Sequence, residues 1–158
     1  MIESNFDRTA YLIPDEPGVD QMNSLLRGEI SAVEAYVMVL EKLEQDPDAI
    51  NLHEFLDDHT KAVAYWKEQI DREGAFSEES SGPWGTAVEA FIATAKLLGN
   101  NVAISALDEG EAHGLKVYEE VLGSDDMTRD QRAHVRDVLI PNQRKHIALL
   151  DEMKKVKH

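Results

Sequence analysis

The sequence predicts an all-α protein, organised as a four-helix bundle with one long connection between the second and third bundle helices. Over long stretches, apolar residues recur at three- and four-residue steps, the period of a helix that buries one face. No stretch shows the strict alternation of a half-buried strand. A loop dense in Ser, Gly and acidic residues, 73–83, separates the first pair of helices from the rest. We therefore expect an N-terminal arm, 1–17, and one bundle domain, 18–158.

Two helices are expected before this loop and one short helix directly after it. The first pair covers about 19–44 and 49–72, joined by a short turn. The helical pattern then resumes over 84–98 and is interrupted at Gly99, a residue type that tolerates the left-handed backbone found at helix ends. We expect 84–98 to be an extra helical segment within the crossover, with Trp84 as one of its packing residues.

The last two bundle helices are expected on either side of a short turn. The third covers about 101–122. The fourth is expected to begin near Thr128, whose hydroxyl can cap the first turn. Pro141 falls inside the fourth helical pattern and is expected to disturb it, because proline has no N–H to donate.

Composition excludes several classes of function. The chain has 31 acidic and 16 basic side chains, a net charge of −15, which argues against a nucleic-acid-binding surface. There is no cysteine, so disulfides and thiolate metal sites are excluded and any metal would be held by oxygen and imidazole ligands. No apolar run approaches the length of a membrane span, and the N-terminus does not have the pattern of a signal peptide. We expect a cytoplasmic protein that does not contact membranes.

Four polar residues fall within the apolar stripes, one on each bundle helix: Glu29, His59, Glu111 and His146. An ionised carboxylate in an apolar core is costly unless it is paired or binds a metal. Imidazole together with carboxylate suits iron, manganese or zinc. The pattern therefore predicts a core site at which two Glu and two His either hold one metal ion or satisfy one another.

Two tyrosines repeat the spacing of the glutamates. Tyr36 and Tyr118 each follow one of these glutamates by seven residues, two turns along the same helix face. Their hydroxyl groups could form hydrogen bonds around the site, although a tyrosine at such a position is also a common packing residue. Glu34 lies at the edge of the first stripe and is a weaker candidate ligand.

The order of these motifs resembles the ferritin-like di-iron carboxylate superfamily. The resemblance covers about 19–155 and consists of two Glu-x6-Tyr pairs, each followed by a histidine on the next bundle helix. The stretch 107–122 is also similar to an uncharacterised bacterial four-helix-bundle family, the domain of unknown function 2383. The resemblance implies a role in iron handling, or in redox or stress-related chemistry. It also allows a homodimer, since ferritin-like bundles often associate.

The chain departs from the di-iron pattern at two positions. Di-iron members carry Glu-x-x-His on the second and fourth helices. Leu56 and Gln143 occupy those glutamate positions here, so a two-metal centre would need Glu34, Glu109 or another neighbour as a substitute. We expect one metal or none. The alternative to a metal protein is a non-catalytic structural or interaction bundle with a degenerate, metal-free site, and whether the protein is an enzyme stays open.

Overall fold

The computed structural model describes residues 17–156, and it confirms the all-α prediction: this part of the chain is helical and contains no strand. The first helix, α2 (Pro17–Leu43), already begins at Pro17. The predicted arm otherwise lies outside the described residues. None of the helices between residues 17 and 156 combines the length and the apolar character needed to cross a membrane.

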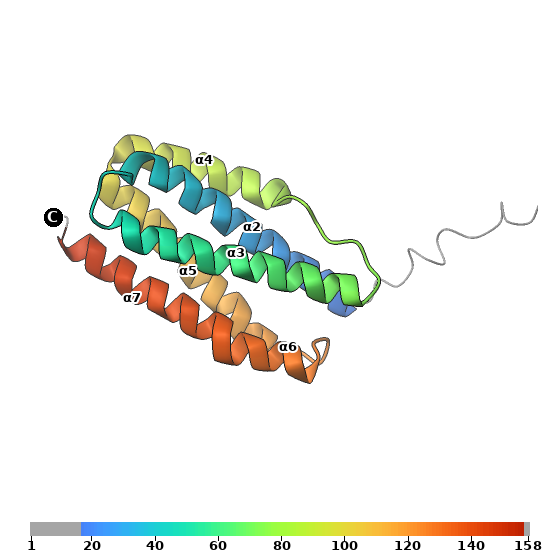
Figure 1. Ribbon diagram of the computed structural model, residues 1–158. Coiled ribbons are helices and arrows are strands. Elements are labelled where there is room, and N and C mark those ends of the chain that lie inside the picture. The colour runs from blue at the N-terminus through green and yellow to red at the C-terminus, as the bar shows by residue number, and fades with distance from the viewer. Residues whose placement is uncertain (1–16, 157–158) are drawn as a thin grey trace, which may run out of the picture.

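Helix α2 packs along its length against α3 (Ala49–Arg72), after a turn of a few residues (Figure 1). The apolar stripe of each helix supplies the contact. Leu26, Val39 and Leu43 of α2 are buried, as are Leu52, Phe55 and Trp66 of α3. This antiparallel pair supplies one half of the residues that surround the site.

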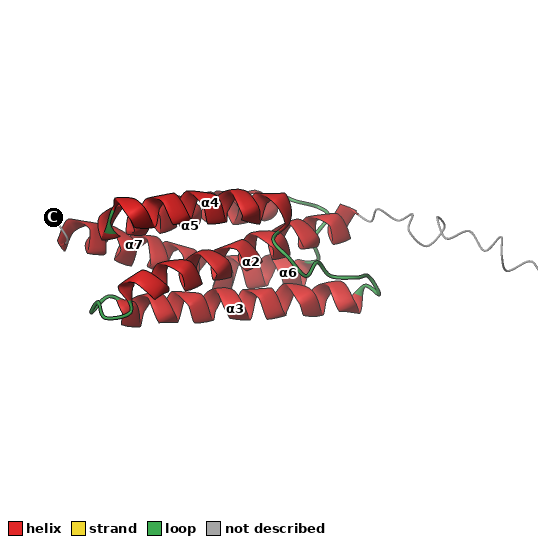
Figure 2. Ribbon diagram, turned by 90° about the horizontal axis from the view of Figure 1, so that it is seen from above, coloured by secondary structure: helices red, strands yellow, loops and turns green. Residues whose placement is uncertain are grey.

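A further helix, α4 (Gly82–Leu98), lies within the long connection that follows α3. It packs against α2 and, less extensively, against α5 (Asn100–Val121), and in the view from above it lies nearest the viewer with no helix drawn over it (Figure 2). The break predicted at Gly99 is confirmed. Gly99 has φ of 129°, a backbone angle that L side chains rarely adopt, so α4 ends and the chain turns into α5.

The last helical stretch contains a wider turn just before Pro141. It consists of α6 (Arg129–His134), a π-helical segment η2 (Val135–Leu139) and α7 (Ile140–Val156), which packs against α5. The disturbance expected at Pro141 thus takes the form of a π-helical turn, which accommodates a residue that cannot donate a backbone hydrogen bond. The chain remains helical through it.

Two apolar clusters fill the core, one on each side of a polar layer. One cluster includes Tyr36, Phe55 and Leu107, and the other includes Trp66 and Tyr118. On each of α2, α3, α5 and α7, the chain passes from one cluster to the other across a single buried Glu or His. The candidate site is this polar layer.

The cap of α6 gives a test of the fold. The Thr128 hydroxyl accepts a hydrogen bond from the Gln131 backbone N–H at 3.1 Å, and the Gln131 side chain accepts one from the Thr128 N–H at 3.0 Å. Thr128→Ala removes half of this reciprocal pair and should lower the free energy of unfolding by about 1 kcal/mol, measured by chemical denaturation. Thr60→Ala is the control, because the exposed Thr60 hydroxyl bonds only to its own helix. Equal effects of the two substitutions would contradict the capping role.

Candidate metal centre

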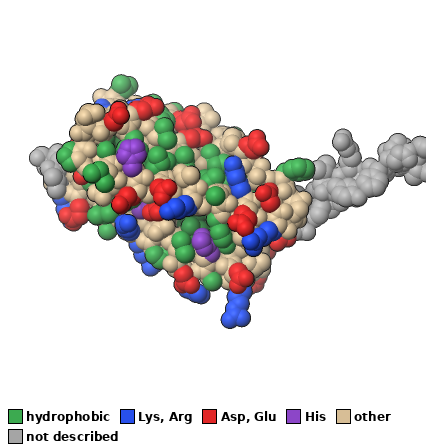
Figure 3. Space-filling view, viewed as in Figure 1, with side chains coloured by type: hydrophobic (Ala, Val, Ile, Leu, Met, Phe, Trp, Pro, Cys, Tyr) green, Lys and Arg blue, Asp and Glu red, His purple; other side chains and the backbone are tan. Residues whose placement is uncertain are grey.

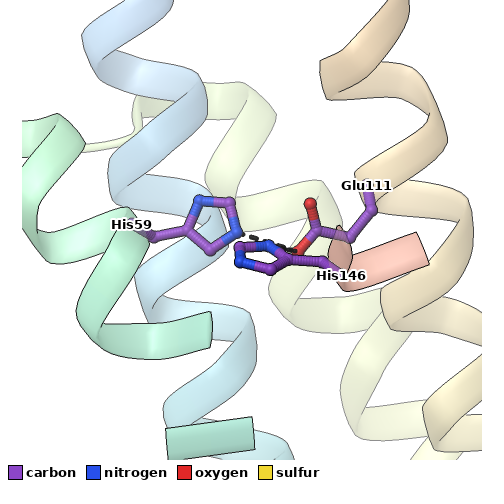
Figure 4. Close-up of side chains that lie close together, drawn as sticks. All are labelled: His59, Glu111 and His146. Atoms are coloured by element: carbon purple, nitrogen blue, oxygen red, sulfur yellow. Dashed lines mark hydrogen bonds and ion pairs between the residues drawn. The ribbon is translucent and has the colours of Figure 1, made fainter. Parts of the chain in front are cut away.

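The four polar residues of the stripes meet in the middle of the molecule. Glu29 extends from α2, His59 from α3, Glu111 from α5 and His146 from α7, and each is at most 5% exposed. Figure 4 shows His59, Glu111 and His146 with their polar atoms directed at one another. Residues more than one hundred positions apart in the sequence therefore share one small volume of the core.

Each histidine ring lies between two carboxylates. His59 contacts Glu29 Oε2 through Nδ1 at 2.6 Å and Glu111 Oε1 through Nε2 at 2.9 Å. His146 contacts Glu111 Oε1 through Nδ1 at 3.0 Å and Asp58 Oδ2 through Nε2 at 2.8 Å. An ionised carboxylate oxygen only accepts hydrogen bonds, so each ring nitrogen that carries a proton donates to the carboxylate beside it.

The tyrosines connect the two halves of the site reciprocally. The Tyr36 hydroxyl on α2 donates to Glu111 Oε1 on α5 at 2.5 Å. The Tyr118 hydroxyl on α5 donates to Glu29 Oε1 on α2, and accepts a bond from Trp66 Nε1 at 3.0 Å. Since each tyrosine follows its glutamate by seven residues and the two helices run in opposite directions, each tyrosine is level with the glutamate of the other helix. The repeated spacing therefore builds one network.

Burial and charge act in opposite directions on the ionisable groups of the site. Burial alone would lower the pKa of His59, but Glu111 and Glu29 outweigh it and raise that pKa well above its usual value. Burial would raise the pKa of Glu111, but His59 and His146 outweigh it and lower that pKa to about 2. Burial, and then the nearby carboxylates, raise the pKa values of Tyr36 and Tyr118, which therefore stay protonated and donate.

Three of the four predicted ligands lie close enough together that they could hold a metal ion. His59, Glu111 and His146 each offer a donor atom, and these atoms lie within 4.8 Å of one another. Glu111 Oε2 is buried and has no hydrogen-bond partner, although the other oxygen of the same carboxylate receives three hydrogen bonds. A buried carboxylate oxygen without a partner is costly, and a cation would satisfy it. Glu29 contacts the outer nitrogen of His59 and is not part of this group.

The residues considered as substitute ligands lie elsewhere. Glu34 accepts a hydrogen bond from Ser81, and Glu109 is exposed on the surface of α5. Gln143 is buried beside the site, but its amide donates to the backbone carbonyl of Glu111 at 3.1 Å. Neither Glu34 nor Glu109 thus completes a second metal position in the arrangement described, and Gln143 supports the backbone that carries Glu111.

Asp58 is the residue that the sequence patterns did not identify. It directly precedes His59, one residue off the apolar stripe of α3, and its side chain is 23% exposed. A helix turns by about 100° per residue, so Asp58 faces α7 while His59 faces the centre. The only signal in the sequence is an acidic residue next to a core histidine, which is common on helix surfaces. The contact between Asp58 and His146 can be recognised only once the position of α7 beside α3 is known.

Comparisons with models of protein families, with curated proteins and with solved structures found no match to this chain. The family resemblance stated from the motifs therefore stays a prediction. The functional argument depends on the geometry of the site alone.

The charged layer should give stability a distinctive dependence on pH. The pKa of Glu111 is lowered from 4.5 to about 2, so its contribution of about 3 kcal/mol is present above pH 4.5 and is lost as pH falls through 2. The pKa of His59 is raised, so its contribution is lost as pH rises through that elevated value. Denaturation of the metal-free protein across pH measures both limits. Glu111→Gln should reduce the fall in the free energy of unfolding between pH 4.5 and 2. An unchanged fall over this range would contradict the pairing of Glu111 with the histidines.

Gly114 gives a test of the support behind Glu111. A Cβ at this position would lie 2.6 Å from Gln143 Nε2, whereas one at the exposed Gly110 would meet nothing within 4 Å. Alanine favours a helix over glycine by about 1 kcal/mol, so Gly110→Ala should stabilise the protein by that amount. Gly114→Ala should be about 2 kcal/mol less stable than this control, because it breaks the bond between Gln143 and the Glu111 carbonyl. Equal free energies of unfolding for the two variants would show that the close contact between Gly114 and Gln143 does not affect stability.

Proposed function

We propose that the protein binds one transition-metal ion per chain through His59, Glu111 and His146. The observation that carries the proposal is the buried, unpartnered Oε2 of Glu111 beside two imidazole rings. Nitrogen and oxygen donors of this kind suit iron, manganese or zinc. Three protein ligands leave a position for water or another small ligand, the arrangement of many reactive metal sites.

The spacing of the donors supports this assignment. Two atoms that each lie about 2.1 Å from one ion are roughly 3–3.5 Å apart in a tetrahedral or octahedral site. His59 Nε2 and His146 Nδ1 lie 2.9 and 3.0 Å from Glu111 Oε1, so small side-chain shifts would admit an ion. The ion would replace the protons on these two nitrogens, and metal affinity should therefore increase with pH.

The outer nitrogens of both rings are held by carboxylates. Glu29 contacts His59 Nδ1, and Asp58 contacts His146 Nε2. A carboxylate behind a metal-bound imidazole fixes the ring orientation and increases the basicity of the ligating nitrogen. We assign Glu29 to this role in the arrangement described. For Glu29 to act as the fourth ligand, as the sequence predicts, its carboxylate would have to turn away from His59 Nδ1.

The order of the helices supports a ferritin-like fold as part of the same proposal. A short turn joins α2 to α3, a long connection containing α4 follows, and a short turn leads from α5 to α6. One carboxylate within the metal-binding group favours one ion over two. Iron handling, or a redox or stress-related role, is the function that such a fold and site together suggest.

A metal-free structural or interaction protein is the second candidate, and one observation favours it. Apart from Glu111 Oε2, no side-chain nitrogen or oxygen of Glu29, His59, Glu111 and His146 is buried without a hydrogen-bond partner. Two imidazolium groups between carboxylates would form a self-sufficient ionic layer. Compared with well-packed apolar residues in the same positions, such a layer offers little net stability, because apolar residues often replace a buried ion pair without loss of stability.

A metal titration separates the two candidates. We expect one ion of Fe²⁺, Mn²⁺ or Zn²⁺ to bind per chain, with release of protons, as measured by calorimetry in buffers of different ionisation enthalpy. Glu111→Gln keeps the side-chain shape and should weaken binding by at least about 100-fold. His113→Ala is the control, because His113 is exposed on the same helix and should leave binding unchanged.

Absence of binding for all three metals would exclude the metal proposal. In that case Glu29→Leu combined with His59→Leu should leave the free energy of unfolding unchanged or increased, as expected for a dispensable ionic layer.

The same double variant also tests the metal site. If the double variant is less stable than the wild type only when metal is present, the result would support the metal site. At 100 times the dissociation constant, bound metal should add about 2.7 kcal/mol.

A further inference from the structure

The outer surface of α4 is apolar and has no partner within the described chain. Trp84 was expected to pack within the crossover; it lies on this crossover helix with its ring centroid 5.3 Å from that of His113 on α5, and it is 51% exposed. Three further large apolar side chains of this helix are exposed: Phe91 51%, Leu97 88% and Leu98 68%. With about 200 Å² for a large apolar side chain, these fractions leave roughly 500 Å² of apolar surface on one helix, at the upper end of what monomers expose.

The exposed residues follow the spacing of a helix–helix seam. Trp84, Phe91 and Leu98 are separated by seven residues, and Ala87 and Thr94 lie between them. This is the heptad pattern by which two helices pack along their length. The small side chains at the intermediate positions would let a second helix approach closely.

The charge of α4 differs from that of the rest of the chain. The protein has a net charge of −15, and acidic side chains are spread over the face seen in Figure 3. The seventeen residues of α4 carry one acid, Glu89, and one base, Lys96, and therefore no net charge. At 100° per residue, both project from the flank of the helix away from the seam. A second copy of so acidic a protein could approach most easily along this face.

We propose that α4 is the interface of a symmetric homodimer, with the two α4 helices packed antiparallel about an axis at Phe91. The spacing of the seam supports this occupant. Trp84 and Leu98 lie equally far on either side of Phe91, so a two-fold axis there would place Trp84 of each chain against Leu98 of the other. With Leu97 at the edge of the seam included, two such faces would bury at most roughly 1,000 Å² together, the lower limit for a specific interface, and dissociation in the micromolar range is expected.

Analytical ultracentrifugation of the full chain tests the interface. The wild-type protein should dimerise, and Phe91→Glu should be monomeric, because it places two like charges at the axis. Ile50→Glu is the matched control, since Ile50 is 73% exposed on α3 and lies outside the seam; it should dimerise as the wild type does. Circular dichroism should show the same helix content in all three proteins.

Salt gives a second readout. Raising ionic strength from about 0.01 to 0.15 M shortens the screening length from about 30 to 8 Å and should strengthen the dimer, because it screens repulsion between two acidic chains. An interface held by ion pairs would weaken instead, and that result would overturn the proposal.

Crosslinking tests the antiparallel register, since the natural chain has no cysteine. Ala87→Cys combined with Thr94→Cys should give covalent dimers with a short thiol crosslinker, and neither single variant should do so. Efficient crosslinking of the single variants would contradict the register. A wild-type monomer at about 100 μM would overturn the dimer itself. If the monomer dimerised only after removal of residues 1–16, the occupant of the seam would be the chain's own N-terminal segment.

Discussion

The structure depends on one constraint: the charged groups in its core must be paired with one another or with a cation. Glu111 is central to this constraint. One of its oxygens receives hydrogen bonds from Tyr36, His59 and His146, while the other is buried without a partner. Removing a carboxylate from water costs several kcal/mol, and three donors on one oxygen offset part of that cost. The remaining oxygen is the reason to expect a cation.

This constraint accounts for much of the surrounding architecture. The reciprocal bonds from Tyr36 and Tyr118 fix α2 and α5 in register, because a slip of one turn would separate both tyrosines from their glutamates. Gly114 admits Gln143, which holds the backbone of Glu111. The charged layer thus specifies how the helices pack, and its contribution to specificity can exceed its contribution to stability.

The sequence predicted the fold class and the central residues because both depend on helical periodicity. His59 and Glu111 could be placed in the core because each interrupts an apolar stripe, and the break at Gly99 followed from local backbone preference. Asp58 could not be found in this way, because its role depends on where α7 lies beside α3. The exposed half of Trp84 could not be predicted for a related reason: helical periodicity identifies an apolar face but does not show whether another helix covers it.

The central claim is that His59, Glu111 and His146 hold a metal ion, and anomalous diffraction from crystals grown with Fe²⁺, Mn²⁺ or Zn²⁺ tests it most directly. The metal-binding proposal predicts one anomalous peak per chain, about 2.1 Å from His59 Nε2, His146 Nδ1 and a carboxylate oxygen of Glu111. A site without an anomalous peak, in which both imidazole rings still donate to the Glu111 carboxylate, would contradict the claim and favour the metal-free layer.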